Sequence, residues 1–136
     1  MMQKLNKIII QEIEAVQNLL EALEEQHRCI IVNEIFGLEA CVNIIKEANK
    51  NIASIEVQRR QLTENRAMSS IIEELRNVKL ENNYYKIIQL LQEVVLQKDT
   101  NELLIKQGIS FTNRILNVLN PARETKTYNA LGKVNK

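Results

Sequence analysis

Residues 5–23 read LNKIIIQEIEAVQNLLEAL, and this stretch decides the fold. Its apolar residues recur at intervals of three and four, with polar residues such as glutamate and glutamine between them. That spacing places apolar side chains on one face of a helix with 3.6 residues per turn. The face consists of Leu5, Ile8, Ile9, Ile13, Val16, Leu19, Leu20, Leu23, His27, Ile30 and Ile31. We therefore expect a first helix from about Met2 to Val32.

The composition favours helices along the rest of the chain. The 136 residues include 3 Gly and 1 Pro, which disfavours the many turns of a β fold. Hydrophobic residues make up 45% of the sequence, enough to bury a core. We expect an all-α protein, an elongated antiparallel helical bundle or hairpin of three long helices and one short helix, with a flexible C-terminal tail.

The helix boundaries follow from capping residues. Asn33 is a candidate N-cap for a second helix that ends near Leu62, and a hairpin here is preferred to one unbroken helix. Its apolar face would contain Cys41, Ile44, Ile45, Ala48, Ile52, Ile55 and Leu62. A short helix over 71–78 would be capped by Ser69 or Ser70, and the longest helix would begin at Asn82 or Asn83 and end near Leu119.

Pro121 divides the chain into two predicted parts. A proline disfavours helical conformation in the residue before it, so the last helix should stop here. We expect a helical bundle over 1–120 and a flexible basic tail over 121–136. The tail holds four basic residues, Arg123, Lys126, Lys133 and Lys136, against Glu124.

The sequence offers little for catalysis, so we expect no enzyme activity. Its one histidine, His27, follows Glu24 at the spacing of di-iron bundles, but such sites need two of these pairs and two further carboxylates. An edge-of-core histidine is the favoured interpretation. Cys29 is expected on the outer face of the first helix and Cys41 on the inner face of the second. No cofactor and no metal ion are expected, because the other ligands of such a site are not apparent.

Charge and hydropathy point to a cytoplasmic protein. The net charge of +1 gives no footprint for nucleic acid. No apolar run approaches the roughly 20 residues of a membrane span, and the N-terminus does not resemble a signal peptide. Two cysteines in no CxxC spacing suggest free thiols in a reducing compartment.

The end of the longest helix carries more apolar surface than one contact requires. After Asn101 its apolar residues cover about half the circumference of the helix or more. Gly108 lies among them, where it costs about 1 kcal/mol relative to Ala, and a neighbouring helix at close approach would justify that cost. From the pattern alone, this surface fits a core, a homodimer seam or a binding face.

From Asn101 to Leu119 the sequence has the pattern of a long amphipathic helix, and Thr127-Tyr128-Asn-Ala-Leu-Gly132 follows after a break. This end of the chain resembles the C-terminus of the FlgN-type flagellar export chaperones, which have a long amphipathic helix, a loose break and a Tyr with a Gly four residues later. The resemblance covers nearly the whole chain, including the leucine-rich first helix. The family's first turn at a capping Asp or Asn and its Glu-x-x-Arg pattern are matched by Asn33 and by Glu56 and Arg59. Leu131, Lys133 and Lys136 depart from the family's tail.

The resemblance implies a cytosolic chaperone of flagellar type III export. It would bind the C-terminal helical segments of hook-associated (hook–filament junction) proteins, prevent their premature association and deliver them to the export gate. The substrate-binding residues implied are Leu104, Ile105, Gly108, Ile109, Phe111, Ile115, Leu116 and Leu119. Tyr128 would dock on the cytosolic domain of the export-gate membrane protein. The alternative is a generic helical-bundle or coiled-coil adaptor without an export role.

Overall fold

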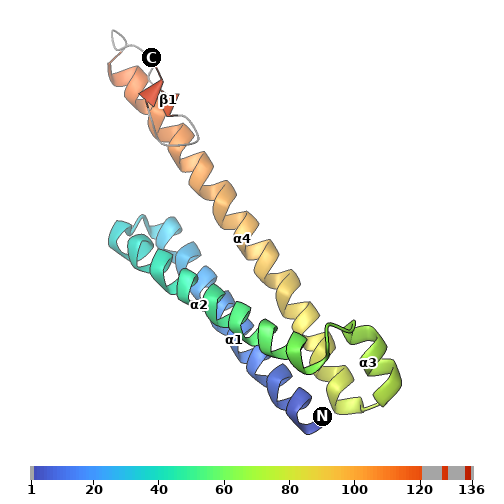
Figure 1. Cartoon of the computed structure of the whole chain (residues 1–136). Helices are drawn as coiled ribbons and strands as arrows, with labels where there is room; N and C mark the ends of the chain where they lie inside the picture. The colour runs from blue at the N-terminus through green and yellow to red at the C-terminus, as the bar shows by residue number, and fades with distance from the viewer. Residues whose placement is uncertain (1, 121–126, 129–133, 136) are drawn as a thin grey trace. The chain divides into compact units, whose positions relative to one another are not determined.

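The computed structural model of the chain describes residues 2–120, 127–128 and 134–135. Four helices lie in this part of the chain: α1 (Met2–Val32), α2 (Ile35–Leu62), α3 (Met68–Leu75) and α4 (Val78–Leu119) (Figure 1). The all-α prediction, with three long helices and one short helix, is confirmed. Strands β1 (Thr127–Tyr128) and β2 (Val134–Asn135) pair antiparallel. The rest of the predicted tail, residues 121–126, 129–133 and 136, lies outside the described residues.

A two-residue turn joins α1 to α2, so the predicted hairpin is confirmed. The prediction of Asn33 as N-cap is wrong: Asn33 adopts a left-handed conformation with φ 56°, and Glu34 is the N-cap. Asparagine tolerates this conformation better than most residues, which suits it to the turn itself. The Glu34 N–H donates to the Cys29 carbonyl at 2.9 Å and closes the end of α1.

The starts of α3 and α4 differ from the predictions. α3 begins at Met68 after Ala67, not at Ile71 after a serine cap. α4 begins at Val78, because Asn77 Oδ1 accepts the Leu80 N–H at 2.8 Å and caps the helix. The cap predicted at Asn82 or Asn83 is therefore wrong, while the predicted end near Leu119 is confirmed.

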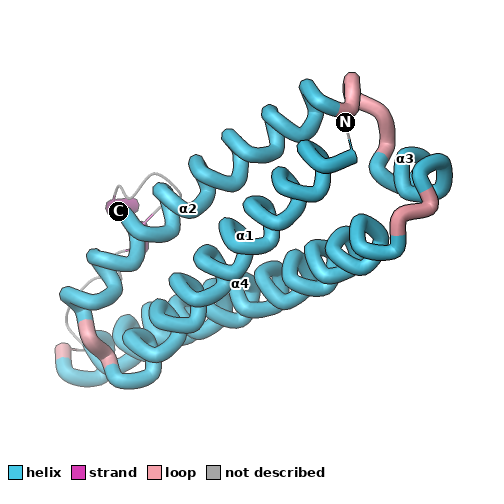
Figure 2. Tube along the Cα trace, turned by 90° about the horizontal axis from the view of Figure 1, so that it is seen from below, coloured by secondary structure: helices cyan, strands magenta, loops and turns pink. Residues whose placement is uncertain are grey.

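The chain forms two compact units, Met1–Asn101 and Glu102–Lys136, and the boundary falls inside α4. In the first unit α1 lies between α2 and the beginning of α4 (Figure 2). Asn77 contacts Met2 at one end of α1, and Asn101 contacts Leu23 further along, so α1 and α4 run parallel. Two buried clusters hold these helices together: Leu5, Ile9, Ile13, Met68, Ile71, Leu80 and Ile87 in one, Val16, Leu19, Leu23 and Val94 in the other.

The structure contradicts the predicted placement of three residues, Cys29, Ile31 and Ile44. Cys29 is fully buried and not on an outer face, because the first turn of α2 covers it. That cover depends on Gly37, where a Cβ atom would lie 2.6 Å from Cys29 Sγ. Ile31 is 64% exposed although it belongs to the predicted apolar face, and Ile44 is also exposed. Cys29 and Cys41 are both free and buried.

Candidate functional site

Four buried residues of α4 recur at intervals of seven: Leu80, Ile87, Val94 and Asn101. Seven residues are close to two helical turns, so these side chains form one line along the helix, here called the α4 line. Side chains of α1 pack against the three apolar members of this line in the two buried clusters. The line therefore attaches the first part of α4 to the first unit.

Asn101 ends the buried part of this line with a polar contact. The Asn101 side chain is 1% exposed, and its Nδ2 donates to the Leu23 carbonyl at 2.8 Å and to Gln26 Oε1 at 3.0 Å. Its Oδ1 accepts from Gln97 Nε2 at 3.0 Å and lies 3.2 Å from His27 Nδ1. His27 is thus a partly buried structural residue, in agreement with the edge-of-core interpretation.

Beyond Asn101 the same spacing continues with Gly108 and Ile115, but the side chains become exposed. At 100° per residue, the eight predicted binding residues fall within an arc of about 160° centred on the direction of Asn101. We call this arc the α4 apolar face; it consists of Leu104, Ile105, Gly108, Ile109, Phe111, Ile115, Leu116 and Leu119. Leu104 is half-buried, while Ile109 and Phe111 are each 59% exposed.

Gly108 lies near the middle of the α4 apolar face. A Cβ atom added there would meet nothing within 4 Å, so the neighbouring helix that the sequence suggested is not found among the described residues. Glycine contributes no side chain here, and its carbonyl accepts a hydrogen bond from Thr112 Oγ1 at 2.9 Å. A second helix can approach most closely at such a position.

The physical character of the α4 apolar face suits binding. At 100° per residue, Lys106 and Arg114 fall toward the opposite side of the helix, and Thr112 is the polar residue of the range 102–119 that lies within the arc. An amphipathic helix from another protein is the type of ligand that such a face receives.

In residues 2–120 and the two short strands, no cluster of His, Cys, Asp and Glu side chains is arranged to hold a metal ion. Within the same residues, every helix is too short or too polar to cross a membrane.

Tyr128, the predicted docking residue, lies in β1. Its backbone pairs with Val134 in the register of the two-stranded sheet. It belongs to the second unit, as do the residues of the α4 apolar face.

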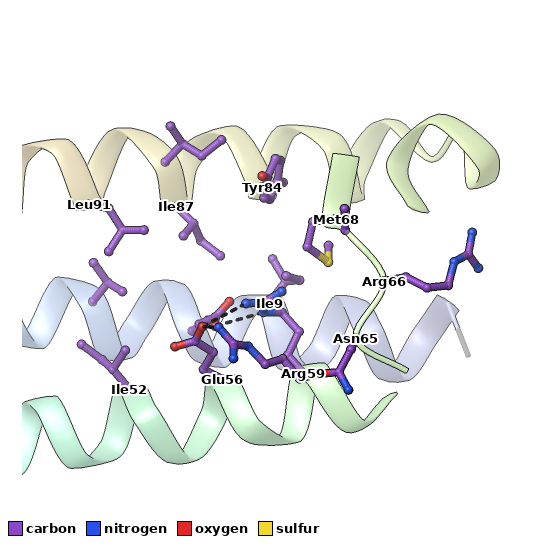
Figure 3. Close-up of a pocket in the computed structure, with 15 residues that line it drawn as sticks. Ile9, Ile52, Glu56, Arg59, Asn65, Arg66, Met68, Tyr84, Ile87 and Leu91 are labelled. Atoms are coloured by element: carbon purple, nitrogen blue, oxygen red, sulfur yellow. Dashed lines mark hydrogen bonds and ion pairs between the residues drawn. The ribbon is translucent and has the colours of Figure 1, made fainter. Parts of the chain in front are cut away.

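A groove in the first unit was not predicted from the sequence. It has a volume of about 560 Å³ and is lined by α1, α2 and the beginning of α4 (Figure 3). We call it the α2–α4 groove. Its apolar lining includes Ile52, Ile88 and Leu91, and Arg60 and Arg66 also line it. Ile88 and Leu91 follow Tyr84 at intervals of four and three, a second line beside the α4 line that could have indicated this surface.

An ion-pair network lies in the lining of this groove. Arg59 Nε donates to Glu12 Oε1 at 3.2 Å, and Glu56 Oε1 accepts from Arg60 Nη2 at 2.6 Å. Burial raises the pKa of the Glu12 carboxyl, while the Arg59 charge partly opposes that rise. The Glu56 and Arg59 pattern noted in the sequence thus joins α2 to α1.

A family model described as FlgN protein matches residues 1–136. No curated protein and no solved structure matches the chain.

Proposed function

The chain belongs to the FlgN family of flagellar export chaperones, and we propose that it binds the C-terminal helical segments of hook-associated proteins through the α4 apolar face. In this proposal the chaperone acts in the cytoplasm, covers segments that would otherwise associate before export and delivers them to the export gate. The family is one of chaperones and not of enzymes, and the proposed mechanism needs no cofactor or covalent chemistry.

One observation carries the proposal: the line of residues that α1 covers up to Asn101 continues into an exposed apolar face. Leu119 is 76% exposed, and Ile109 and Phe111 are more than half exposed. Burial of apolar area contributes about 25 cal/mol per Å², so a face of this kind supplies a driving force for an amphipathic ligand helix. Because this binding consists mostly of apolar contacts, it covers the substrate's C-terminal segment without any covalent reaction.

Variants on opposite sides of α4 test this proposal. Ile109→Asp and Ile115→Asp place a carboxylate within the apolar face, whereas Ser110→Asp and Asn117→Asp place the same group on the opposite side. We expect the first pair to lose co-purification with the C-terminal segment of a hook-associated protein and the second pair to retain it. Circular dichroism should show equal helicity in all four variants.

Retained binding by folded Ile109→Asp and Ile115→Asp would exclude this surface as the binding site. If the chain binds no junction-protein segment selectively, the alternative of a generic helical adaptor is favoured. A homodimer seam is a further use of the same face. Light scattering would detect it as a dimer that Ile115→Asp converts to a monomer, and that result would also count against the proposal.

We further propose that Tyr128 docks the loaded chaperone on the cytosolic domain of the export-gate membrane protein. An aromatic side chain at a protein interface often contributes about 2 kcal/mol or more to binding. The basic residues around it in the sequence, such as Lys126 and Lys133, would speed encounter with an acidic partner. Tyr128→Ala should bind substrate normally and secrete less of it, while Tyr128→Phe should stay closer to wild type. Equal secretion by Tyr128→Ala and wild type would refute the docking role.

A further inference from the structure

The α2–α4 groove has the dimensions of a site for two turns of helix. On α4 its lining extends from Tyr84 to Leu91, and on α1 from Ile9 to Val16. Seven residues at 1.5 Å each give a length of about 10 Å on both helices. Figure 3 shows side chains from α1, α2 and α4 lying along this length, with Asn65 and Arg66 of the α2–α3 connection at one end.

The groove is apolar along α4 and at Ile52 of α2, and part of that surface is exposed. Leu91 is 42% exposed, and Ile52 and Ile88 are half-buried. Tyr84 extends the apolar side toward Met68 (Figure 3). These side chains offer contacts to residues spaced i, i+3, i+4 and i+7 on a ligand helix, which is the usual pattern of helix-in-groove recognition.

The charges at the groove select among possible ligand helices. The lining holds Arg59, Arg60 and Arg66 against Glu12 and Glu56. Arg59 is occupied by the two glutamates, at 3.2 Å from Glu12 Oε1 and 3.7 Å from Glu56 Oε1. Arg60 and Arg66 have side chains that are 61% and 46% exposed. Arg60 Nη2 donates to Glu56, and Arg66 Nη2 donates to Glu74. A guanidinium has five N–H donors, so both arginines can also bind a carboxylate of a ligand.

The same charges argue against a second copy of this chain as the ligand. Its own exposed apolar helix, residues 102–119, carries Lys106 and Arg114 against Glu102. With one carboxylate against two cations, that helix has little to pair with Arg60 and Arg66. A helix with several carboxylates beside its apolar face can pair with both.

We propose that the α2–α4 groove is a second protein-binding site, which takes an amphipathic helix with acidic residues beside its apolar face. Apolar anchors of the partner lie on Ile52, Ile88 and Leu91, and its carboxylates pair with Arg60 and Arg66. The site belongs to the first unit alone and does not depend on the α4 apolar face.

A matched pair of peptides tests the proposal. Both are about 18 residues long, with end groups blocked and the same Leu positions at i, i+3, i+4 and i+7; one carries Glu at its polar positions and the other Lys. Fluorescein anisotropy measures the affinity for the full chain. The Glu peptide should bind about tenfold more tightly than the Lys peptide, and ¹⁵N-labelled protein should show shifts at Ile52, Ile88 and Leu91.

Variants assign the binding to the groove. Leu91→Asp should remove binding of the Glu peptide, while Leu96→Asp, at a 70% exposed position outside the lining, should not. The double variant Arg60→Gln and Arg66→Gln should weaken the Glu peptide about three- to tenfold and abolish the preference over Lys. Ile109→Asp, which tests the α4 apolar face, should leave this binding unchanged.

Any of four results would overturn the proposal. One is equal affinity for the two peptides, and another is unchanged binding by a folded Leu91→Asp variant. The third is a concentration-dependent dimer that Leu91→Asp dissociates, because it would make a second copy the ligand. The fourth is a loss of peptide binding in Ile109→Asp while Leu91→Asp still binds the peptide. This result would assign the peptide to the α4 apolar face and exclude the groove.

Discussion

Replacing Asn101 tests how α4 is attached to α1. Asn101→Ala removes the two hydrogen bonds donated by Nδ2, to the Leu23 carbonyl and Gln26 Oε1, and both contacts of Oδ1. The partners differ in exposure: Gln26, His27 and Gln97 are half-buried and can turn to water, whereas the bond to Leu23 is fully buried. The cost therefore depends mainly on the buried bond and on the volume removed.

A buried hydrogen bond contributes a net of about 0.5–1.5 kcal/mol, and the partly exposed bonds contribute less. With the small cavity added, we expect Asn101→Ala to lower the free energy of unfolding by about 2 kcal/mol. Asn101→Asp should cost more, about 3–5 kcal/mol, because a buried carboxylate would face the Leu23 carbonyl and Gln26 Oε1. Gln97→Ala is the matched control and should cost less than about 1 kcal/mol.

Urea denaturation followed by circular dichroism measures these differences. With an m-value of about 2 kcal/mol/M, the Asn101→Ala midpoint should fall by about 1 M. Hydrogen exchange should show the loss of protection concentrated in the second half of α1 and around residue 101. An Asn101→Ala variant within about 0.5 kcal/mol of wild type would refute the structural role assigned to this side chain.

Three further variants probe other positions, each with its own measurement. Gly108→Ala should stabilise α4 locally by about 1 kcal/mol, because nothing lies within 4 Å of the added methyl, and slower hydrogen exchange would show this. If a ligand helix approaches closely at this glycine, substrate affinity should fall at the same time. Gly37→Ala should lower the midpoint of thermal unfolding, at a cost of about 1–3 kcal/mol, because its Cβ would lie 2.6 Å from Cys29 Sγ. The double variant with Cys29→Ala should lose less stability than the two single variants added together, and additive losses would contradict this. Burial raises the pKa of Glu12 above its ordinary 4.5, so the folded chain binds more protons than the unfolded chain just above pH 4.5. The stability of wild type relative to Glu12→Gln should therefore decrease as pH rises through that raised pKa. A difference in unfolding free energy that does not change with pH would contradict this.

The sequence predicted the helices well because their apolar spacing is long and regular. The bounds of α1 follow from that periodicity, and the end of α4 follows from Pro121. The helix starts were harder, because Asn33, Asn77, Asn82 and Asn83 are all chemically suited to cap a helix. Asn77 caps α4 because Leu80, three residues later, is fully buried in the first cluster and fixes where the helix begins.

Surfaces were predictable only where one helix carries them. The α4 apolar face lies on consecutive turns of a single helix, so 100° per residue was enough to place its eight residues together. The α2–α4 groove draws Ile52 from α2, Leu91 from α4 and Arg66 from a connection, and their proximity depends on how three helices pack. The burial of Cys29 was missed for the same reason, since α2 and not α1 determines it.

The spacing of α4 explains why this helix can serve both as a support and as a binding surface. Leu80, Ile87 and Val94 are covered by α1, and the same seven-residue spacing then reaches Asn101, Gly108 and Ile115. A buried asparagine in such a line fixes register at some cost in stability, because its hydrogen bonds are made in only one alignment of the two helices. Asn101 thereby locks α4 on α1 immediately before the exposed face begins. The seven-residue spacing that holds the fold up to Asn101 thus also runs through Gly108 and Ile115, which belong to the face proposed to bind the substrate.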